Sequence, residues 1–554
     1  MPSPVETRTR RLGTIPLVVL AATAAFTGLS LVWSIVAPLG EAPDEPAHLA
    51  LVLHLADGNP YPSYDGLENQ AAIIRLCRTH ASATRACPRE GEPVTPTSMR
   101  RHPIGEAPDK GSRPAWDDEG GDRRVGQLNQ MPQHPPLYYQ LMGGILRAGR
   151  ALHGGPWSLD RELALLRFAN VLLVAPLPLL AWWAVRRFRG PDPAAIAASL
   201  VLLGIPMLTH IGSTLNNDNL LTLLGAVLAA LLAGVARGDR SLRTAAAVGA
   251  VAGLALLTKA FAVVLPPAIV VAYLVGGAPA AWRERAKALL APLAVAGATT
   301  FVLAGWWYIG VRIRTGRFAP TVENDRLTSA LAPPGFSPEP ATFAEEFLRN
   351  FNTRFWGSFG WYTIRIPTLL AALCTAVVLA ALVAALVPRR WPDGATRPQR
   401  LSALTVTVLL GGFVAARAWS IYSTTSKFQF IQGRYLFAGI VGLALVVGLG
   451  AARGLGRRAP LVVLALAAAL QLETLRRALQ GWWGGPALGP RGQVRAMVAW
   501  SGLPGEVVAL VTLLAAGAAV WLLAELVRDQ RGEPATTVRG PEGDETGPVV
   551  SPAT

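Results

Sequence analysis

Long apolar stretches separated by short polar connections fill most of the chain from residue 12 to residue 527. Most hold roughly 18 to 25 residues, the length that a helix needs to cross about 30 Å of hydrocarbon. The pattern predicts an all-α polytopic membrane protein of about twelve transmembrane helices. The expected spans are 12–38, 163–185, 193–211, 219–236, 244–258, 261–277, 288–309, 367–387, 402–420, 435–450, 459–473 and 506–527.

Basic residues cluster in alternate connections between these spans. Three arginines lie in residues 1–11, and further clusters at 186–189 and 237–243 fall on the same side if the spans alternate. Short connections rich in Lys and Arg remain in the cytoplasm. We therefore expect a multi-pass plasma-membrane protein with a cytoplasmic N-terminus. Arg476 and Arg477, which fall outside, are the exception.

Three substantial segments, 39–162, 310–366 and 474–505, lie outside in this topology. In the first, residues 47–56 and 135–152 are apolar enough to form short helices lying in the membrane interface. The tail after Asp529 is rich in Gly, Pro and Thr, which predicts disorder. The expected organisation is a cytoplasmic N-terminus (1–11), a transmembrane core (12–450), C-terminal transmembrane helices (451–528) and a cytoplasmic tail (529–554).

Composition and charge agree with a membrane protein. The chain is 51% hydrophobic and 16% charged, with a mean hydropathy of +0.36. The net charge of +16 comes largely from the connections, where positive charge sets orientation. No RNA- or DNA-binding motif is recognisable, so we expect membrane lipids and no nucleic acid as partners.

The strongest chemical candidate is the segment Pro43–His48, directly after the first span. Asp44 and Glu45 can hold a divalent cation such as Mg²⁺ or Mn²⁺, or one can act as a base that the other orients. If a helix begins here, His48 projects towards the same patch. The alternative is structural, with Asp44 capping a helix and Pro46 in its first turn.

A second candidate is the segment Gln133–Tyr139, where the chain returns to the membrane. Its prolines stiffen the turn, and Tyr138 and Tyr139 suit the aromatic belt at headgroup level. That interpretation is structural. The functional alternative is that His134 contacts a substrate phosphate, with Tyr138 beside it.

Polar and basic residues also mark the outer ends of later spans. Asn217 and Asp218 belong to the run 216–219, which either binds a substrate or forms a capped turn. Lys259 and Arg434 can each hold a lipid phosphate, Arg through its two-pronged guanidinium. Either can instead extend its charge to the interface without binding anything.

Aromatic residues and cysteines complete the candidates. The cluster 355–362 precedes the eighth span and suits an interfacial anchor, although an aromatic face such as that of Trp361 also stacks on sugars. Cys77 and Cys87 share the first outer segment. In an oxidising compartment they can form a disulfide, and the alternative is two free thiols.

Taken together, the acidic pair, the His-Pro-Pro-Leu-Tyr-Tyr return and the Leu-Thr-Lys at a span end resemble the GT-C superfamily of membrane glycosyltransferases. More narrowly, 43–48, 216–219, 355–361 and 432–435 resemble the bacterial membrane family called domain of unknown function 2142. The resemblance covers about residues 12–450.

The resemblance implies a GT-C-like fold and an inverting sugar transfer on the extracytoplasmic face. The donor would be a polyprenyl-phosphate-linked sugar, and the acceptor a glycan, lipid or protein of the cell envelope. It gives the role of base or metal ligand to Asp44, with Glu45 as its companion, and the donor phosphate to Arg434 and Lys259. Two rival functions remain: a flippase for lipid-linked sugars, and a non-enzymatic assembly protein.

Overall fold

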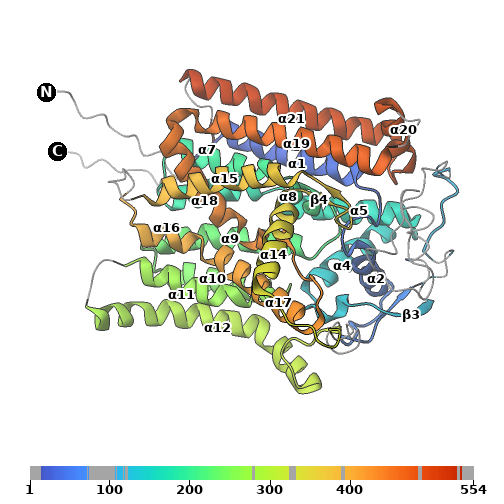
Figure 1. Cartoon of the computed structure of the whole chain (residues 1–554), viewed down its shortest axis with the longest axis horizontal. Coiled ribbons are helices and arrows are strands. Elements are labelled where there is room, and N and C mark those ends of the chain that lie inside the picture. Colours follow the sequence, from blue (N-terminus) through green and yellow to red (C-terminus); the bar gives the residue numbers. More distant parts are fainter. Residues whose placement is uncertain are drawn as a thin grey trace, which may run out of the picture.

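Helices make up almost all of the regular secondary structure in the computed structural model of this protein (Figure 1). The long helices lie roughly along one common axis, with α2 and α4 at one end of the bundle. The structure describes residues 14–70, 73, 107, 109–116, 118, 121, 123–277, 281–322, 332–387, 394–484, 489–532 and 537–539.

All twelve predicted apolar stretches fall on helices. In the described residues, eight helical stretches are long and apolar enough to cross a membrane, or nine if one bent pair is a single span. The protein is therefore a multi-pass membrane protein, whereas the number twelve stays a prediction. Seven of these eight stretches are α1 (Leu17–Val36), α5 (Leu159–Val174) together with α6 (Leu177–Arg187), α9 (Asp218–Ala236), α12 (Trp282–Thr315), α15 (Thr368–Leu386), α17 (Thr405–Thr425) and α21 (Gly505–Arg531), and the eighth runs from residue 433 to residue 483. Two shorter apolar helices are α10 (Leu242–Leu256) and α11 (Leu265–Val275).

The third predicted span is bent. Helix α7 (Asp192–Val201) and the 3-10 turn η2 (Leu202–Gly204) meet α8 (Pro206–Gly212) at an angle of 70°. The proline supplies no N–H and disfavours helical geometry in the residue before it. Ile205 accordingly has φ −118° and ψ 87°. After the bend, α8 ends at Gly212, shortly before the polar run 216–219.

The segment after residue 433 folds back on itself. It comprises η4 (Gly433–Gly439), α18 (Ile440–Leu455), η5 (Gly456–Arg458) and α19 (Ala459–Trp483). Both α18 and α19 pack against α7, which has only 10 residues. A straight helix of 51 residues would far exceed the membrane. The chain therefore reverses near Gly456, which has φ +57°, and the tenth and eleventh predicted spans are two separate helices.

The two helices predicted in the first outer segment are present, but their setting differs from the prediction. Every residue of α2 (Glu45–Ala56) except Pro46 and Ala47 is buried, because the helix packs against α4 (Leu137–His153). Tyr138 and Tyr139 are fully buried. The expected contact of α2 and of the two tyrosines with lipid was therefore wrong, because packing between α2 and α4 buries them. Their position at the level of the membrane interface stays a prediction.

Short elements join the bundle. Strand β1 (Thr14–Pro16) pairs with β6 (Thr537–Arg539), so part of the tail predicted to be disordered forms a strand, and α21 continues to Arg531. The other strand pairs are β2 (Glu68–Gln70) with β3 (Arg124–Leu128), and β4 (Ser358–Phe359) with β5 (Ile364–Arg365). The remaining helices are η1 (Met131–Gln133), η3 (Ala260–Val264), α14 (Pro340–Trp356), α16 (Arg397–Ala403) and α20 (Pro490–Trp500).

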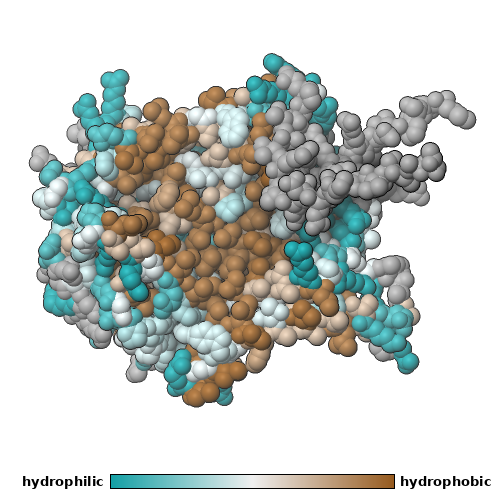
Figure 2. Space-filling view, turned by 180° about the vertical axis from the view of Figure 1, so that it is seen from behind, coloured by the Kyte–Doolittle hydropathy of each residue, from teal (hydrophilic) through white to brown (hydrophobic). Residues whose placement is uncertain are grey.

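Exposed apolar side chains mark the surface that faces lipid. Leu373 and Val383 of α15, and Leu513 and Val520 of α21, are each more than half exposed. Figure 2 shows one face of the molecule with a broad apolar band between two polar ends. A soluble protein rarely exposes apolar surface on this scale. The band is the part that the bilayer covers.

Close packing at Gly225 fixes η4 against α9. A Cβ at this position would lie 2.1 Å from the carbonyl oxygen of Ala438. We predict that Gly225→Ala destabilises the protein by about 1–3 kcal/mol, because α9 and η4 must separate. Gly517 of α21 has no atom within 4 Å of its Cβ position, so Gly517→Ala is the matched control. Thermal unfolding in detergent measures both, and equal midpoints would contradict the prediction.

Candidate functional site

Four of the predicted site residues meet at one end of the bundle. Asp44 precedes α2, Asp218 opens α9, Lys259 lies between α10 and η3, and Arg434 lies in η4. Lys259 Nζ is 2.5 Å from Asp218 Oδ1, and Arg434 Nη2 is 2.6 Å from Asp44 Oδ2. Arg434 Nε lies 3.3 Å from Asp218 Oδ2, without hydrogen-bond alignment. The four side chains form a row in which positive and negative charges alternate, from Lys259 through Asp218 and Arg434 to Asp44. We call this row the charge cluster.

The members of the charge cluster differ in accessibility. The side chains of Asp218, Lys259 and Arg434 are 3–6% exposed, whereas that of Asp44 is 25% exposed. Asp44 has φ +66° and makes no capping hydrogen bond with its side chain. Its carboxylate is therefore free of the structural role considered above. It is the charged group of the cluster that an incoming molecule can reach.

Several donors in and beside the cluster have no hydrogen-bond partner among the described residues. They are Nε and Nη1 of Arg434 and the amide nitrogens of Asn216 and Asn217. Buried donors without partners are costly, and ligands or water commonly satisfy them. Asp218 Oδ2 is the one acceptor of the cluster without a hydrogen-bond partner among the described residues. Because the other four atoms are donors, a group rich in acceptor oxygens can satisfy most of this open capacity.

The backbone around Arg434 is held closely. A Cβ on Gly433 would lie 2.3 Å from the backbone nitrogen of Phe355, so only glycine lets η4 approach the end of α14 so closely. Arg354 donates to the carbonyl of Ile431 at 2.6 Å, and the Tyr362 hydroxyl donates to the side chain of Gln432. These contacts from α14 and the β4–β5 turn set the direction of the Arg434 side chain.

Lys259 occupies a largely aromatic setting. Its Nζ lies 4.9 Å from the ring centres of both Phe261 and Tyr435, close enough for cation–π attraction. Burial lowers the pKa of Lys259, while Asp218 acts in the opposite direction. Asn217 Oδ1 accepts a longer contact of 3.5 Å from Nζ. The ammonium thus depends on Asp218 for its charge balance.

The predicted histidines lie beside the cluster. His48 Nδ1 shares a hydrogen bond of 2.9 Å with the hydroxyl of Tyr139, and the two rings are stacked. Burial, followed by the charges of Lys259 and Arg434, lowers the pKa of His48 well below its usual value. Burial and Lys259 lower the pKa of His134 in the same way. Both imidazoles therefore favour the neutral form, in which one ring nitrogen donates a hydrogen bond and the other accepts one. They add no positive charge to the site.

Glu45 turns away from Asp44. Arg167 donates to both of its oxygens, at 2.8 and 2.6 Å, and the backbone nitrogens of Gly40 and Leu215 donate to it as well. Because this buried carboxylate is fully engaged, it cannot reach a substrate. The predicted catalytic companion of Asp44 is therefore a structural residue.

The same geometry bears on the expected metal. Asp44 and Glu45 point to different arginines, so they do not form a shared ligand pair. No group of three His, Cys, Asp or Glu side chains within the described part of the chain is arranged to hold a metal ion. These residues do not fit Mg²⁺ or Mn²⁺, and no chemistry is assigned to such an ion.

The other predicted residues have mixed positions. Tyr138 donates a hydrogen bond to Asn170 at 2.9 Å, and its ring packs edge-on against the ring of His48. It therefore helps to hold His48 in place. Trp361 is half-buried and, among the described residues, makes no hydrogen bond or ring contact with the cluster. Cys77 and Cys87 lie outside the described residues, so their disulfide stays a prediction.

Arg167 is the main residue that the sequence reasoning missed. It lies within the predicted span 163–185, where a charged side chain is expensive and therefore needs a partner. That rule could have singled it out, although nothing in the sequence identified Glu45 as the partner. Gln130, 3.5 Å from Asp44, carried no such signal.

We predict that Arg167→Ala destabilises the protein by about 3–5 kcal/mol, because it leaves the buried carboxyl group of Glu45 without its cationic partner. Arg476→Ala, which breaks an exposed and solvent-screened pair with Glu473, should change stability far less. Chemical unfolding of the purified protein in detergent tests this difference, and similar losses in both variants would refute it.

The lowered pKa of His48 predicts a pH effect on stability. The unfolded chain binds a proton at this histidine near pH 6.5, whereas the folded chain does not, so stability falls as pH drops below that value. We expect a lower unfolding temperature at pH 5 than at pH 7, with a smaller difference in His48→Gln. An undiminished difference in the variant would show that other groups cause it.

Comparison with solved structures finds partly similar backbones, among them the following two. ArnT from Cupriavidus metallidurans bound to undecaprenyl phosphate is 16% identical, with 91% of this chain and 77% of that chain covered and a TM-score of 0.45. The oligosaccharyltransferase of Archaeoglobus fulgidus in its apo form is 13% identical, with 88% and 60% covered and a TM-score of 0.42. At these scores the geometry of the site, and not the overlap, is the basis for a functional argument.

No curated protein matches the sequence. A family model does match, described as "Predicted membrane protein (DUF2142)" and covering residues 27–444. This range contains every member of the charge cluster as well as Arg167. The chain therefore belongs to the DUF2142 family of membrane proteins.

Proposed function

We propose that this protein is an inverting membrane glycosyltransferase that takes a sugar from a polyprenyl-phosphate donor and passes it to a cell-envelope acceptor on the extracytoplasmic face. The observation that carries the proposal is the charge cluster itself. It combines a reachable carboxylate, Asp44, with two buried cations, of which Arg434 has unused donors. The motifs that resemble GT-C enzymes point to the same residues.

The donor phosphate would bind at Arg434 and Lys259. Nε and Nη1 of Arg434 lack partners, and phosphate oxygens are strong acceptors for a guanidinium. The amide nitrogen of Asn217 can supply a further donor. Because these groups lie where α9, α10 and η4 begin or end, a phosphate carried on a membrane lipid can reach them from the headgroup level.

Phosphate binding would also release the base. In the present arrangement Arg434 holds Asp44 at 2.6 Å. A phosphate that takes over the guanidinium leaves Asp44 free to accept the proton of the acceptor hydroxyl. The acceptor oxygen then bonds to C1 of the sugar, the bond from C1 to the phosphate oxygen breaks, and the phosphate leaves with the electron pair. Arg434 and Lys259 stabilise the charge that develops on it.

The alternatives remain testable. The bent pair α7–α8 is a feature that a flippase for lipid-linked sugars would share, since broken helices mark many transporters. The charge cluster nevertheless lies at the end of the bundle that carries α2 and α4, and not at its middle, which favours a reaction at the rim. A non-enzymatic assembly protein would need no base at Asp44.

We predict that Asp44→Asn lowers sugar transfer by at least about 100-fold, because the amide cannot accept the proton. Asp192→Asn is the matched control, since Asp192 pairs with Arg186 at the far end of α6. Each variant is expressed in a deletion strain, and its lipid-linked sugars and envelope glycans are compared with those of the parent. Full transfer by Asp44→Asn at normal protein levels would refute the proposal.

Arg434→Lys separates binding from chemistry. A lysine keeps one charge but loses the two-pronged donor, so we expect weaker donor binding, seen as a KM raised by about tenfold or more with a smaller change in kcat. Vesicles containing the lipid-linked sugar that accumulates in the deletion strain supply the substrate. An unchanged KM would show that Arg434 does not bind the donor. Movement of the lipid without consumption would indicate a flippase.

A further inference from the structure

The first outer segment grips the C-terminal part of the chain at the end of α20. Arg113 donates to the carbonyls of Ala499, Trp500 and Ser501, at 2.6, 3.4 and 3.1 Å. Lys110 donates to the carbonyl of Val498 at 3.0 Å and to that of Leu503. Two cations from residues 110–113 thus cover the last carbonyls of α20 and its connection to α21, residues 501–504, which we call the C-terminal connection.

The C-terminal connection also lies directly on α5. Arg113 forms a buried ion pair with Asp160 of α5, at 2.6 Å. A Cβ on Gly502 would lie 2.7 Å from the carbonyl oxygen of Asp160, so the two backbones are in close contact. Moving the connection therefore requires the first turns of α5 to move or to lose these contacts.

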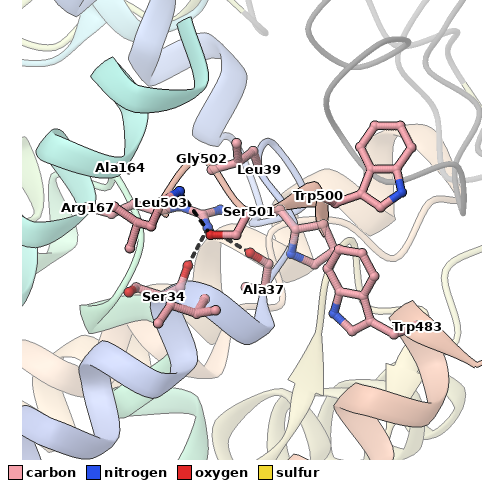
Figure 3. A pocket seen from close by; sticks show the side chains of 12 residues that line it. Ser34, Ala37, Leu39, Ala164, Arg167, Trp483, Trp500, Ser501, Gly502 and Leu503 are labelled. Atoms are coloured by element: carbon pink, nitrogen blue, oxygen red, sulfur yellow. Dashed lines mark hydrogen bonds between the residues drawn. The ribbon is translucent and has the colours of Figure 1, made fainter. Parts of the chain in front are cut away.

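Helix α5 continues from this contact to the buried arginine. Asp160 and Arg167 are seven residues apart, which places them on one face of the helix about 10 Å from each other. Ala164 lies between them on that face. Figure 3 shows Ala164 and Arg167 lining a small pocket together with Ser501, Gly502 and Leu503 of the connection. The same face of α5 thus contacts the connection at one end and holds Glu45 at the other.

The last link joins Arg167 to Asp44. The guanidinium holds Glu45, the first residue of α2, and also donates to the carbonyls of Ser34, Ala37 and Pro38 at the end of α1. Gly40 N donates to Glu45 at 2.9 Å. These bonds fix the turn from α1 into α2, and Asp44 sits in that turn with φ +66°.

We propose that the C-terminal connection positions Asp44, acting through α5 and the Arg167–Glu45 pair. The family model ends at residue 444, so this connection lies in a part of the chain that the model does not cover. Residues 110–113 and 501–504 are then positioning elements for the site and touch no substrate themselves. The role of Asp44 as a base rests on the proposed function. The structural coupling between the C-terminal connection and the position of Asp44 does not.

Hydrogen exchange of the full-length protein in detergent, without donor or acceptor, tests the link. In Gly502→Ala the new methyl group forces the connection away from Asp160. We expect exchange of the amides in residues 38–48, including Gly40, to speed up by about tenfold or more. Gly489→Ala is the matched control, because its Cβ position has no atom within 4 Å. Unchanged exchange in α9 and α18 verifies that each variant is folded.

Lys110→Ala is a second, milder variant, which removes two hydrogen bonds to the connection without adding bulk. The proposal requires that the amides of residues 38–48 exchange faster than in the parent protein in both Gly502→Ala and Lys110→Ala. In Gly489→Ala their exchange rate should equal that of the parent. If exchange rises only at residues 498–503, the contact merely caps α20, and the proposal is overturned. If exchange rises at 38–48 while Asp44→Asn keeps full sugar transfer, the link holds and the function proposed for Asp44 fails.

Discussion

Arg167 and Glu45 meet in the interior of the protein, where a charge alone would be very expensive. The carboxylate accepts two hydrogen bonds from the guanidinium and two from backbone nitrogens. The other N–H groups of the guanidinium donate to three backbone carbonyls, one in the last turn of α1 and two directly after it. Such a pair is stable only when every partner is present. It therefore ties α1, α2, α5 and the segment at Leu215 into one arrangement, and the position of Asp44 follows from it.

The charge cluster shows a different use of charge. Glu45 and Arg167 satisfy each other completely, whereas Arg434 retains two unused donors beside a carboxylate that is partly open to solvent. Incomplete satisfaction is costly for folding, and proteins tend to keep it where a ligand completes the set. Two arginine–carboxylate pairs from adjacent residues, 44 and 45, thus separate into one that is fully hydrogen-bonded and builds the fold, and one that keeps unused hydrogen-bonding capacity.

Sequence reasoning found the helices because span length and hydropathy are set by the thickness of the bilayer, which every membrane helix must match. It also singled out Asp44, Asp218, Lys259 and Arg434, because charged groups beside the membrane need partners and can hold a substrate. It could not divide the roles of Asp44 and Glu45, because the division depends on Arg167, which is 122 residues away. It placed Tyr138 and Tyr139 at the headgroups because an aromatic pair near a span end looks the same whether lipid or another helix covers it.

The pairing of β1 with β6 brings the two ends of the described chain side by side, with Thr14 opposite Arg539. Chains whose ends are close tolerate being joined there and reopened elsewhere. A circularly permuted protein could therefore keep the whole helical bundle while starting at a different connection.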